Sequence, residues 1–466
     1  MRPFELAAGS IVQHVAAQTG EIDDGTITQD AVARAFADRQ EDRLRYCHSM
    51  GAWYFWTGAY WQKDETDRTF QLVRELAREF SEGSRPKDLK EVRKVGFAAG
   101  VERFARGDPI FAVTAEAWDQ DPLLLGTPDG TVDLRSGVLR ASTPQEGLTK
   151  ITTVAPSDAA DCPSWLKFLD EATGGDIELI RFLQQWCGYA LTGLIREHAL
   201  VFVYGPGGNG KSVFLTVLTG ILGDYAATAA MDTFTASHTD KHTTDLAMLR
   251  GARLVTASET EEDRPWAEAR IKQMTGGDPI TARFMRQDNF TFRPQFKLTI
   301  VGNHQPNLRN VDDAARRRFN IVPFIIKPAH PDRNLDEKLK AEWPAILRWM
   351  IDGCLDWQKN GLTRPQSVRD ATDTYFSEQD LFGQWLQEET DAEPDNKNKL
   401  GTSAALYKSW SDFAMRSGEK PGSQKAFAAE MRKRGFEAFR TGSLGRGFRG
   451  IRLRTLTHHS DGSDAW

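Results

Sequence analysis

The 466-residue chain has few cysteines and no long apolar run. Its cysteines are far apart and form no C-x-x-C pair, so neither a zinc site nor a disulfide framework is predicted. No stretch of about 18 apolar residues occurs, which predicts no membrane span. The first residues are too poor in apolar side chains for a signal peptide. We therefore expect a cytoplasmic protein. The cysteines are Cys47, Cys162, Cys187 and Cys354.

The chain also lacks an overall excess of positive charge. Its formal net charge is −6, which argues against a protein that coats nucleic acid generally. The charge is uneven, however. From Asn396 to Arg454 there are 6 Lys and 8 Arg against 4 acidic residues, a net charge of +10. The sequence thus predicts a basic C-terminal segment that can contact phosphates.

The most informative segment is a glycine-rich loop. Residues 205–212 read GPGGNGKS and match G-x-x-x-x-G-K-[ST] in full. The apolar run 199–204 precedes the loop, and a helix-forming stretch from 212 to 218 follows it, which is the context that a phosphate-binding loop requires. Lys211 can reach the β- and γ-phosphates of ATP, and the Ser212 hydroxyl can hold Mg²⁺. The expected nucleotide-binding residues are Gly205, Pro206, Gly207, Gly208, Asn209, Gly210, Lys211, Ser212 and Val213.

Two later strand-like segments end in polar side chains that suit the same chemistry. The run 252–258 is followed by Glu259 and Glu261, either of which could polarise water or hold the magnesium shell. We favour Glu259, for catalysis and for the metal. The run 296–302 is followed by Asn303, which could orient water or sense the γ-phosphate.

Three consecutive arginines, residues 316–318, cannot all face the chain's own phosphates. A guanidinium group suits bidentate recognition of a γ-phosphate, so one of these arginines could serve a neighbouring subunit. Repetition of such a head-to-tail contact closes a ring. A separate segment, 283–292, alternates around a polar turn and predicts a hairpin with Arg286 near its tip. Arg283 and Lys272 could support this hairpin or contact DNA.

We divide the chain by composition and periodicity. Strand and helix signals alternate over the phosphate-loop region, which predicts an α/β fold with a parallel sheet. An aromatic cluster at residues 53–61 is interpreted as core rather than as a base-stacking surface. The expected segments are a mixed N-terminal region (1–120), a preceding domain (121–196), the nucleotide-binding core (197–330), a helical extension (331–390), a linker (391–399), a small basic domain (400–456) and a tail (457–466).

The order of these parts resembles the superfamily 3 helicases, and among them the phage/plasmid primase–helicase family, whose relatives include the poxvirus nucleoside triphosphatases. The resemblance covers about residues 50–455 and depends on the loop, the acidic strand, TGGD at 275–278 with its hairpin, IVGN at 300–303 and Arg317-Arg318. It implies an AAA+-like ATPase core, a hexameric ring and ATP-driven movement on single-stranded or forked DNA. By position, Arg318 matches the arginine offered to the neighbour, with Arg317 next.

The resemblance further implies a winged-helix-like C-terminal domain that binds DNA through Lys425, Arg432 and Arg449, among others. It places the protein in a bacterial host, encoded by a phage, prophage or plasmid. Larger members carry a primase module ahead of this region. Because only about 50 residues precede the aromatic segment here, primer synthesis is expected from a separate chain or from another part of a larger protein. Open alternatives are an origin-binding or loading ATPase without processive unwinding, an RNA-directed ATPase, and a packaging motor.

Overall fold

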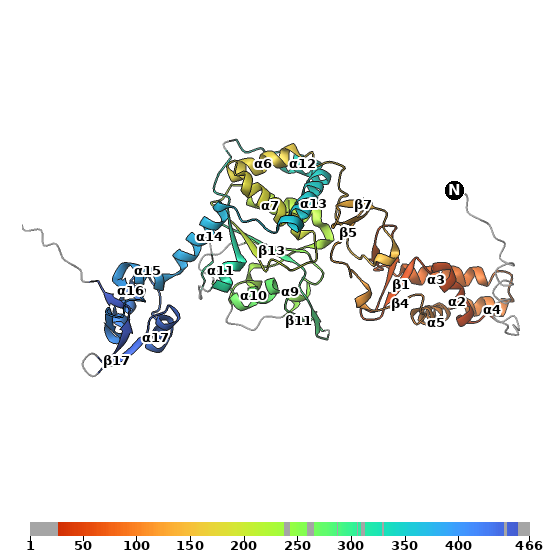
Figure 1. Cartoon of the computed structure of the whole chain (residues 1–466). Helices are drawn as coiled ribbons and strands as arrows, with labels where there is room; N and C mark the ends of the chain where they lie inside the picture. Colours follow the sequence, from red (N-terminus) through yellow and green to blue (C-terminus); the bar gives the residue numbers. More distant parts are fainter. Residues whose placement is uncertain are drawn as a thin grey trace, which may run out of the picture.

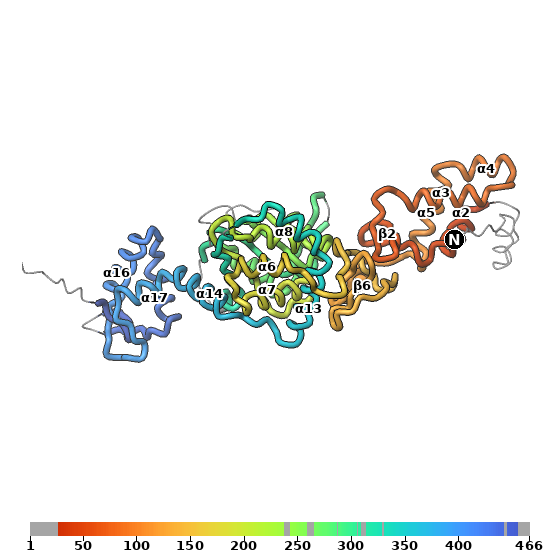
Figure 2. The backbone as a smooth tube through the Cα atoms, turned by 90° about the horizontal axis from the view of Figure 1, so that it is seen from above, coloured from red at the N-terminus to blue at the C-terminus, as the bar shows by residue number. Residues whose placement is uncertain are grey.

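The computed structural model describes residues 27–236, 243–258, 265–286, 288–304, 306–308, 313–328, 330–441 and 445–454. Figure 1 shows an N-terminal body, a central body built on a sheet, and a C-terminal body, arranged in a row. Figure 2 shows the same order from above. Within the described residues, no helix has both the length and the apolar character needed to cross a bilayer.

The N-terminal body packs helices against a small sheet of order β3-β2-β1-β4. Trp53, Tyr54 and Trp61 of the aromatic cluster are buried in it, which confirms their interpretation as core. The elements are α2 (Gln29–Gln40), β1 (Leu44–Cys47), β2 (Ala52–Trp56), β3 (Trp61–Lys63), α3 (Arg68–Phe80), α4 (Pro86–Val92), α5 (Val95–Arg106), β4 (Ala112–Val113) and the 3₁₀ turn η1 (Ala115–Ala117).

A three-stranded antiparallel sheet follows, and it connects the N-terminal body to the central one. Its strands are β5 (Leu124–Thr127), β6 (Gly130–Asp133) and β7 (Val138–Arg140). Thr127 pairs with Gly130, so Pro128 and Asp129 form the two-residue turn between the first two strands. The 3₁₀ turn η2 (Pro144–Glu146) comes next.

The central body contains a five-stranded parallel sheet of order β14-β8-β13-β10-β9. This confirms the expected α/β fold with a parallel sheet. Strands that follow one another in the chain are often not neighbours in this sheet, so the connections cross its faces. The strands are β8 (Leu200–Tyr204), β9 (Ala226–Thr228), β10 (Leu254–Ser258), β13 (Lys297–Gly302) and β14 (Phe319–Pro323).

Both faces of this sheet are covered, because successive side chains of a strand point to opposite faces. In β8, Val201 and Val203 belong to one core cluster, and Leu200 and Phe202 belong to the other. Figure 1 shows the two helical layers on opposite sides of β13. One layer contains α6 (Pro163–Thr173), α7 (Ile177–Ala190), α8 (Lys211–Leu222), α12 (Leu335–Ala341) and α13 (Trp343–Asn360). The other contains α9 (Thr244–Ala247), α10 (Glu268–Gly276), α11 (Asp313–Arg318) and α14 (Gln366–Gln379).

The remaining elements of the central body are short. β11 and β12 form a separate two-stranded antiparallel sheet. These elements are η3 (Gly223–Tyr225), η4 (Met231–Thr233), β11 (Ile280–Ala282) and β12 (Phe290–Phe292).

The C-terminal body has its own apolar core, which includes Trp385, Trp410 and Phe427. The segment expected as a linker, 391–399, is folded onto this body. Thr390–Ala392 pairs with the last strand, and the Lys399 ammonium lies 2.7 Å from Glu393. The elements are α15 (Leu381–Glu389), β15 (Thr390–Ala392), β16 (Leu400–Thr402), α16 (Ser403–Arg416), α17 (Gln424–Lys433), β17 (Ala438–Thr441), β18 (Gly445–Arg449) and β19 (Ile451–Leu453).

Candidate nucleotide site

The glycine-rich loop connects the end of β8 to the start of α8. Gly208 and Gly210 have φ angles of 81° and 87°, a conformation that favours glycine. A Cβ atom on Gly210 would lie 2.6 Å from the ring of Phe168, and one on Gly205 would overlap the carbonyl oxygen of Phe324. Close neighbours thus restrict these positions to glycine. The loop ends at the N-terminus of α8, where backbone N–H groups favour an anion.

Lys211 is buried at the first position of α8, and only 7% of it is exposed. Its ammonium group donates to the carbonyl oxygen of Gly205 at 2.6 Å and to Oδ1 of Asn209 at 2.8 Å. Asn209 in turn donates to the carbonyl oxygen of Phe324. Both partners of the lysine are neutral, and burial lowers the pKa of its amine. A phosphate group would supply the negative charge that these partners do not, so the residues present fit a bound triphosphate.

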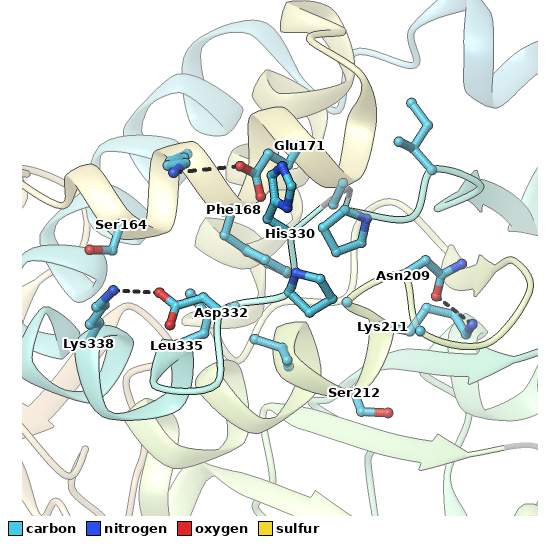
Figure 3. Close-up of a pocket in the computed structure, with 18 of the residues that line it drawn as sticks. Ser164, Phe168, Glu171, Asn209, Lys211, Ser212, His330, Asp332, Leu335 and Lys338 are labelled. Atoms are coloured by element: carbon cyan, nitrogen blue, oxygen red, sulfur yellow. Dashed lines mark hydrogen bonds and ion pairs between the residues drawn. The ribbon is translucent and has the colours of Figure 1, made fainter.

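A cavity of about 760 Å³ opens beside the loop. Figure 3 shows Lys211 and Asn209 on one side of it, and Phe168, Glu171 and His330 on another. The walls come from α6, the loop, the start of α8, Asn303, and the segment that leads into α12. The lining residues are Pro163, Ser164, Lys167, Phe168, Glu171, Ala172, Gly207, Gly208, Asn209, Gly210, Lys211, Ser212, Val213, Asn303, Ile326, Pro328, His330, Pro331, Asp332, Leu335 and Lys338.

The structure brings Asn303 to the phosphate loop, as sequence reasoning expected. β13 and β8 are parallel neighbours, Gly302 pairs with Tyr204, and Asn303 follows directly. Asn303 is exposed and lines the same cavity as Lys211 and Ser212. Ser258, the last residue of β10, ends beside Val301 at this edge of the sheet. Glu259 and Glu261 lie outside the described residues.

The arginine cluster lies at the opposite edge of the sheet. α11 ends at Arg318, and the next residue, Phe319, pairs with Leu200 at the start of β8. β8 spans five residues between this edge and the loop, which at about 3.3 Å per residue separates the two edges by about 13 Å. Arg317 and Arg318 therefore lie at the edge of the sheet away from their own loop.

The three arginines differ in their surroundings. Arg316 is exposed, lies 3.6 Å from Asp373 and packs over the ring of Phe376. Arg317 is exposed, and its carbonyl oxygen accepts a hydrogen bond from Arg364. Arg318 is half-buried and donates to the carbonyl oxygen of Ala314 at 2.7 Å. Its Nε is buried without a hydrogen-bond partner among the described residues.

The expected hairpin is present. β11 pairs antiparallel with β12, with Ile280 opposite Phe292 and Ala282 opposite Phe290. Arg286 is exposed near the tip with a φ of 61°, which is uncommon outside glycine. Arg283 is exposed too, and its backbone N–H donates to the hydroxyl of Thr243 at 3.2 Å. Lys272 lies on α10, before the hairpin, and is half-buried.

The basic residues expected in the C-terminal body lie on two elements. Lys425 and Arg432 are exposed on α17, and their seven-residue spacing puts them on one face of this helix. Arg449 ends β18 and packs over the ring of Phe439. Gly450 follows Arg449 with a φ of 83°, and Ile451–Leu453 form the next strand, β19.

Sequence reasoning missed two groups of residues. Phe168, His330 and Lys338 line the cavity but come from segments distant from the loop, and no local motif marks them. Arg440 and Arg446 face each other across β17 and β18 and are exposed. The alternation of polar and apolar residues in these strands was the available signal. Among the described residues, no group of three His, Cys, Asp or Glu could hold a metal ion.

Two family models and several viral proteins match parts of the chain. Residues 33–174 match the family described as "D5 N terminal like", and residues 203–318 match one described as "Family of unknown function (DUF5906)". The chain is 24% identical over 292 residues to "Putative helicase L207/L206" of Acanthamoeba polyphaga mimivirus, which covers 58% of this chain and 30% of that protein. It is 27% identical over 240 residues to "Putative helicase 022R" of Frog virus 3, covering 46% and 24%.

A "Putative primase" of African swine fever virus is 21% identical over 240 residues, covering 46% of this chain and 25% of that protein. The chain thus spans less than a third of the length of these relatives. The solved apo structure of the NrS-1 C terminal region (305-718) shares the fold, with a TM-score of 0.53 at 8% identity over 90% of this chain and 98% of that one. These matches support the resemblance to the phage-type primase–helicase family.

Proposed function

We propose that this chain is a ring-forming, Mg²⁺- and ATP-dependent DNA helicase of the superfamily 3 type, with an AAA+-like core. The observation that carries the proposal is the division of the site between two sheet edges. One edge holds a buried lysine with neutral partners in a phosphate-binding loop. The other edge holds the arginines that end α11. The names of the viral relatives, putative helicases and a putative primase, support a helicase or primase activity in DNA replication.

The residues around the cavity have distinct tasks in this proposal. Backbone N–H groups of the loop and the Lys211 ammonium hold the phosphates. The Ser212 hydroxyl, with Glu259, would hold Mg²⁺, which supplies charge neutralisation for the leaving phosphate. Glu259 orients and polarises the attacking water, and Asn303 contacts the γ-phosphate from the neighbouring strand.

The arginines complete the site of an adjacent copy. Arg318, assisted by Arg317, stabilises the charge that develops on the transferred phosphoryl group. Because loop and arginines lie on opposite edges of one sheet, each copy can offer one edge to each neighbour. Contacts of this head-to-tail kind close into a ring, and a hexamer is the form we propose.

Nucleic acid would meet two surfaces. Arg283, Arg286 and Lys272 lie on or before the β11–β12 hairpin, which projects from the central body in Figure 1. Lys425, Arg432 and Arg449 lie in the C-terminal body, which we propose to be a winged-helix-like domain. Both surfaces offer guanidinium and ammonium groups to a phosphate backbone, so binding should weaken as salt rises.

The test compares the full chain with Lys211→Ala and with a control, Lys359→Ala, whose lysine is exposed at the end of α13. ATP hydrolysis and strand displacement on a forked DNA duplex are measured for each. Lys211→Ala should lose both, because removal of a lysine at the transferred phosphate removes transition-state stabilisation. The control should retain both.

Three other results would contradict the proposal in different ways. ATP hydrolysis that survives in Lys211→Ala would contradict the assignment of residues 205–212 as the phosphate-binding loop. Hydrolysis without displacement indicates a loading or remodelling ATPase. Stimulation of hydrolysis by single-stranded RNA but not by single-stranded DNA moves the substrate to RNA.

A further inference from the structure

The β11–β12 hairpin carries a row of aromatic rings that runs from the core to solvent. Phe290 and Phe292 are two residues apart in one strand, so both face the same side of the hairpin. Their ring centroids are 6.0 Å apart. Phe284, in the turn, stacks on Phe290 with centroids 5.6 Å apart and an interplanar angle of 27°. Phe292 is 9% exposed, whereas Phe284 is 37% exposed, so the row ends in an open ring.

The middle ring of this row is also contacted by an arginine. Arg250 places its guanidinium 5.2 Å from the centroid of Phe290, which fixes the middle ring. Phe284 is therefore held in place by its inner neighbour, although its outer part faces solvent. An exposed ring that is already ordered loses little entropy when a second flat group stacks on it.

The surroundings of Phe284 combine exposed apolar groups with positive charge. Met285 is 73% exposed, and Met248, beside the hairpin at the end of α9, is 66% exposed. Arg283 and Arg286 flank Phe284 in the chain, and both are exposed. The acidic residues of the described segments 243–258, 277–286 and 288–292 are Asp245, Asp278 and Asp288, and Arg283 and Arg286 are nearer to Phe284 in the chain than any of them. Flat apolar surface beside guanidinium groups suits a base next to a phosphate.

We propose that Phe284 is a base-stacking residue: one unpaired base of a single strand continues the Phe292–Phe290–Phe284 row, while Arg283 and Arg286 contact the adjoining phosphates. This inference rests on the proposed function and adds to it the part of the nucleic acid that the hairpin grips. A paired base keeps both faces inside its own duplex, so the ring selects single strands. Stacking is indifferent to base sequence, which suits movement along any strand.

The experiment measures equilibrium binding of short single strands to the full-length protein in the presence of a non-hydrolysable ATP analogue. The strands are oligothymidylate, the same length of RNA, and a DNA strand of abasic sites with the same number of phosphates. The variants are Phe284→Leu, Phe284→Trp and Arg286→Ala. Phe104→Leu is the control, because Phe104 is an exposed phenylalanine on α5 of the N-terminal body.

Phe284→Leu should bind oligothymidylate about tenfold more weakly, the typical cost of losing one stacked base, with an unchanged slope of log affinity against log salt. Phe284→Trp should bind as tightly as the parent or tighter, which shows that the variants fold. Arg286→Ala should reduce the salt slope by about one. On the abasic strand the parent and Phe284→Leu should be equal, and Phe104→Leu should match the parent throughout.

Equal affinities of the parent and Phe284→Leu for oligothymidylate would overturn the stacking role and leave the helicase proposal intact. A tenfold loss that persists on the abasic strand would also overturn it, because the effect would then not come from bases. Failure of the parent to bind any single strand would overturn both proposals. Tighter binding of RNA with the same dependence on Phe284 would support stacking and move the substrate from DNA to RNA.

Discussion

At the scale of single residues, the site depends on groups that are forced into unfavourable positions. Lys211 is a buried cation, and its partners Gly205 and Asn209 offer only neutral oxygen atoms. Burial costs this charge solvation that neutral dipoles replace only in part. The lysine is thus prepared for an anion before any arrives, because its amine is already dehydrated and directed by two hydrogen bonds.

Gly210 offers a direct test of how closely α6 closes over the loop. In Gly210→Ala, the new methyl group would meet the ring of Phe168, and the backbone would hold an alanine at a φ of 87°. We expect a loss of about 1–3 kcal/mol in the free energy of unfolding. Binding of a non-hydrolysable ATP analogue should weaken about tenfold or more, since a shift of 1.4 kcal/mol suffices. Titration calorimetry and urea unfolding measure these two quantities.

Gly83→Ala is the matched control, because Gly83 has a φ of 79° and no atom near its Cβ position. It imposes the same backbone strain in the N-terminal body, away from the cavity. It should lower stability slightly and leave nucleotide binding unchanged. Nucleotide binding by Gly210→Ala at the affinity of the parent would show that Phe168 does not limit the loop.

The residue scale also shows where sequence reasoning succeeds. The loop, Lys211 and Asn303 were predictable, because each follows a strand directly and parallel strands bring such ends together. The far wall of the cavity could not be predicted from the sequence. In the chain, Phe168 precedes the strands of the parallel sheet and His330 follows them. Only tertiary packing brings these two residues to the loop.

At the scale of elements, α7 and α13 of the central body pack closely against each other. A Cβ atom on Gly353 would overlap the carbonyl oxygen of Gln184, and one on Gly188 would overlap the backbone of Cys354. The two backbones therefore approach each other at a pair of glycines. Backbone atoms cannot move aside as a side chain can, so the crossing point is fixed.

Gly353→Ala should destabilise the protein by about 3 kcal/mol, the upper end of the usual cost of overpacking. Gly96→Ala is the control, because Gly96 lies in α5 with no atom near its Cβ position. Helix propensity predicts that this control gains roughly 0.5–1 kcal/mol. Chemical unfolding followed by circular dichroism compares the two. Equal stabilities of the two variants would contradict the close crossing.

A carboxylate links the same two helices and makes their contact sensitive to acid. Asp356 of α13 accepts two hydrogen bonds from Arg181 of α7, both at 2.8 Å. The Arg181 guanidinium is the largest cause that lowers the pKa of Asp356 to about 2, with Asn360 and Gln185 adding hydrogen bonds. The ionised form is thus bound more favourably in the folded state than in the unfolded one.

The sign of the pH dependence follows from linkage. A carboxyl group whose pKa is lower in the folded state contributes stability above its ordinary pKa, which is 3.8 here, and loses it as pH falls toward about 2. Asp356→Asn should therefore be less stable than the parent near pH 6, and the difference should shrink below pH 4. Urea midpoints measured at intervals between pH 6 and 3 test this. A difference that stays constant with pH would assign the loss to packing alone.

Some helices and strands could be predicted from the sequence and others could not, depending on whether their burial leaves a pattern in the sequence. The strands of the parallel sheet were visible as apolar runs, because both of their faces are buried. The hairpin was predicted over 283–292 as an alternation around a polar turn, whereas its first strand is Ile280–Ala282, before that segment. The folding of 391–399 onto the C-terminal body was not visible, since β15 pairs with β19 across about 60 residues and its sequence is polar.

At the scale of the whole molecule, the proposed function makes Arg317 and Arg318 the groups through which copies meet. They lie on the sheet edge opposite to Lys211, so in this proposal a neighbouring copy supplies the arginine that completes each site. Arg318→Ala should bind an ATP analogue like the parent but lose turnover by about 10³-fold or more, the usual effect of removing such an arginine. Arg316→Ala is the control, because Arg316 contacts Asp373 and Phe376 of its own chain.

Mixing two inactive variants separates a contribution between subunits from one within a subunit. Arg318→Ala subunits keep the lysine, and Lys211→Ala subunits keep the arginine, so a mixed assembly contains some complete sites. Hydrolysis should reappear in the mixture and reach a maximum near equal proportions. Mixtures that stay inactive at every ratio, although mass measurements show co-assembly, would exclude the shared site.

The separation of lysine and arginine across one sheet has a consequence for when the protein can act. If the proposed function holds, a single copy can bind a nucleotide but cannot hydrolyse it, because the arginine that completes the site comes from a neighbouring copy. Turnover per chain should therefore vanish on dilution and rise more steeply than linearly with concentration until assembly is complete. A rise in the concentration of the protein would then be enough to start ATP hydrolysis.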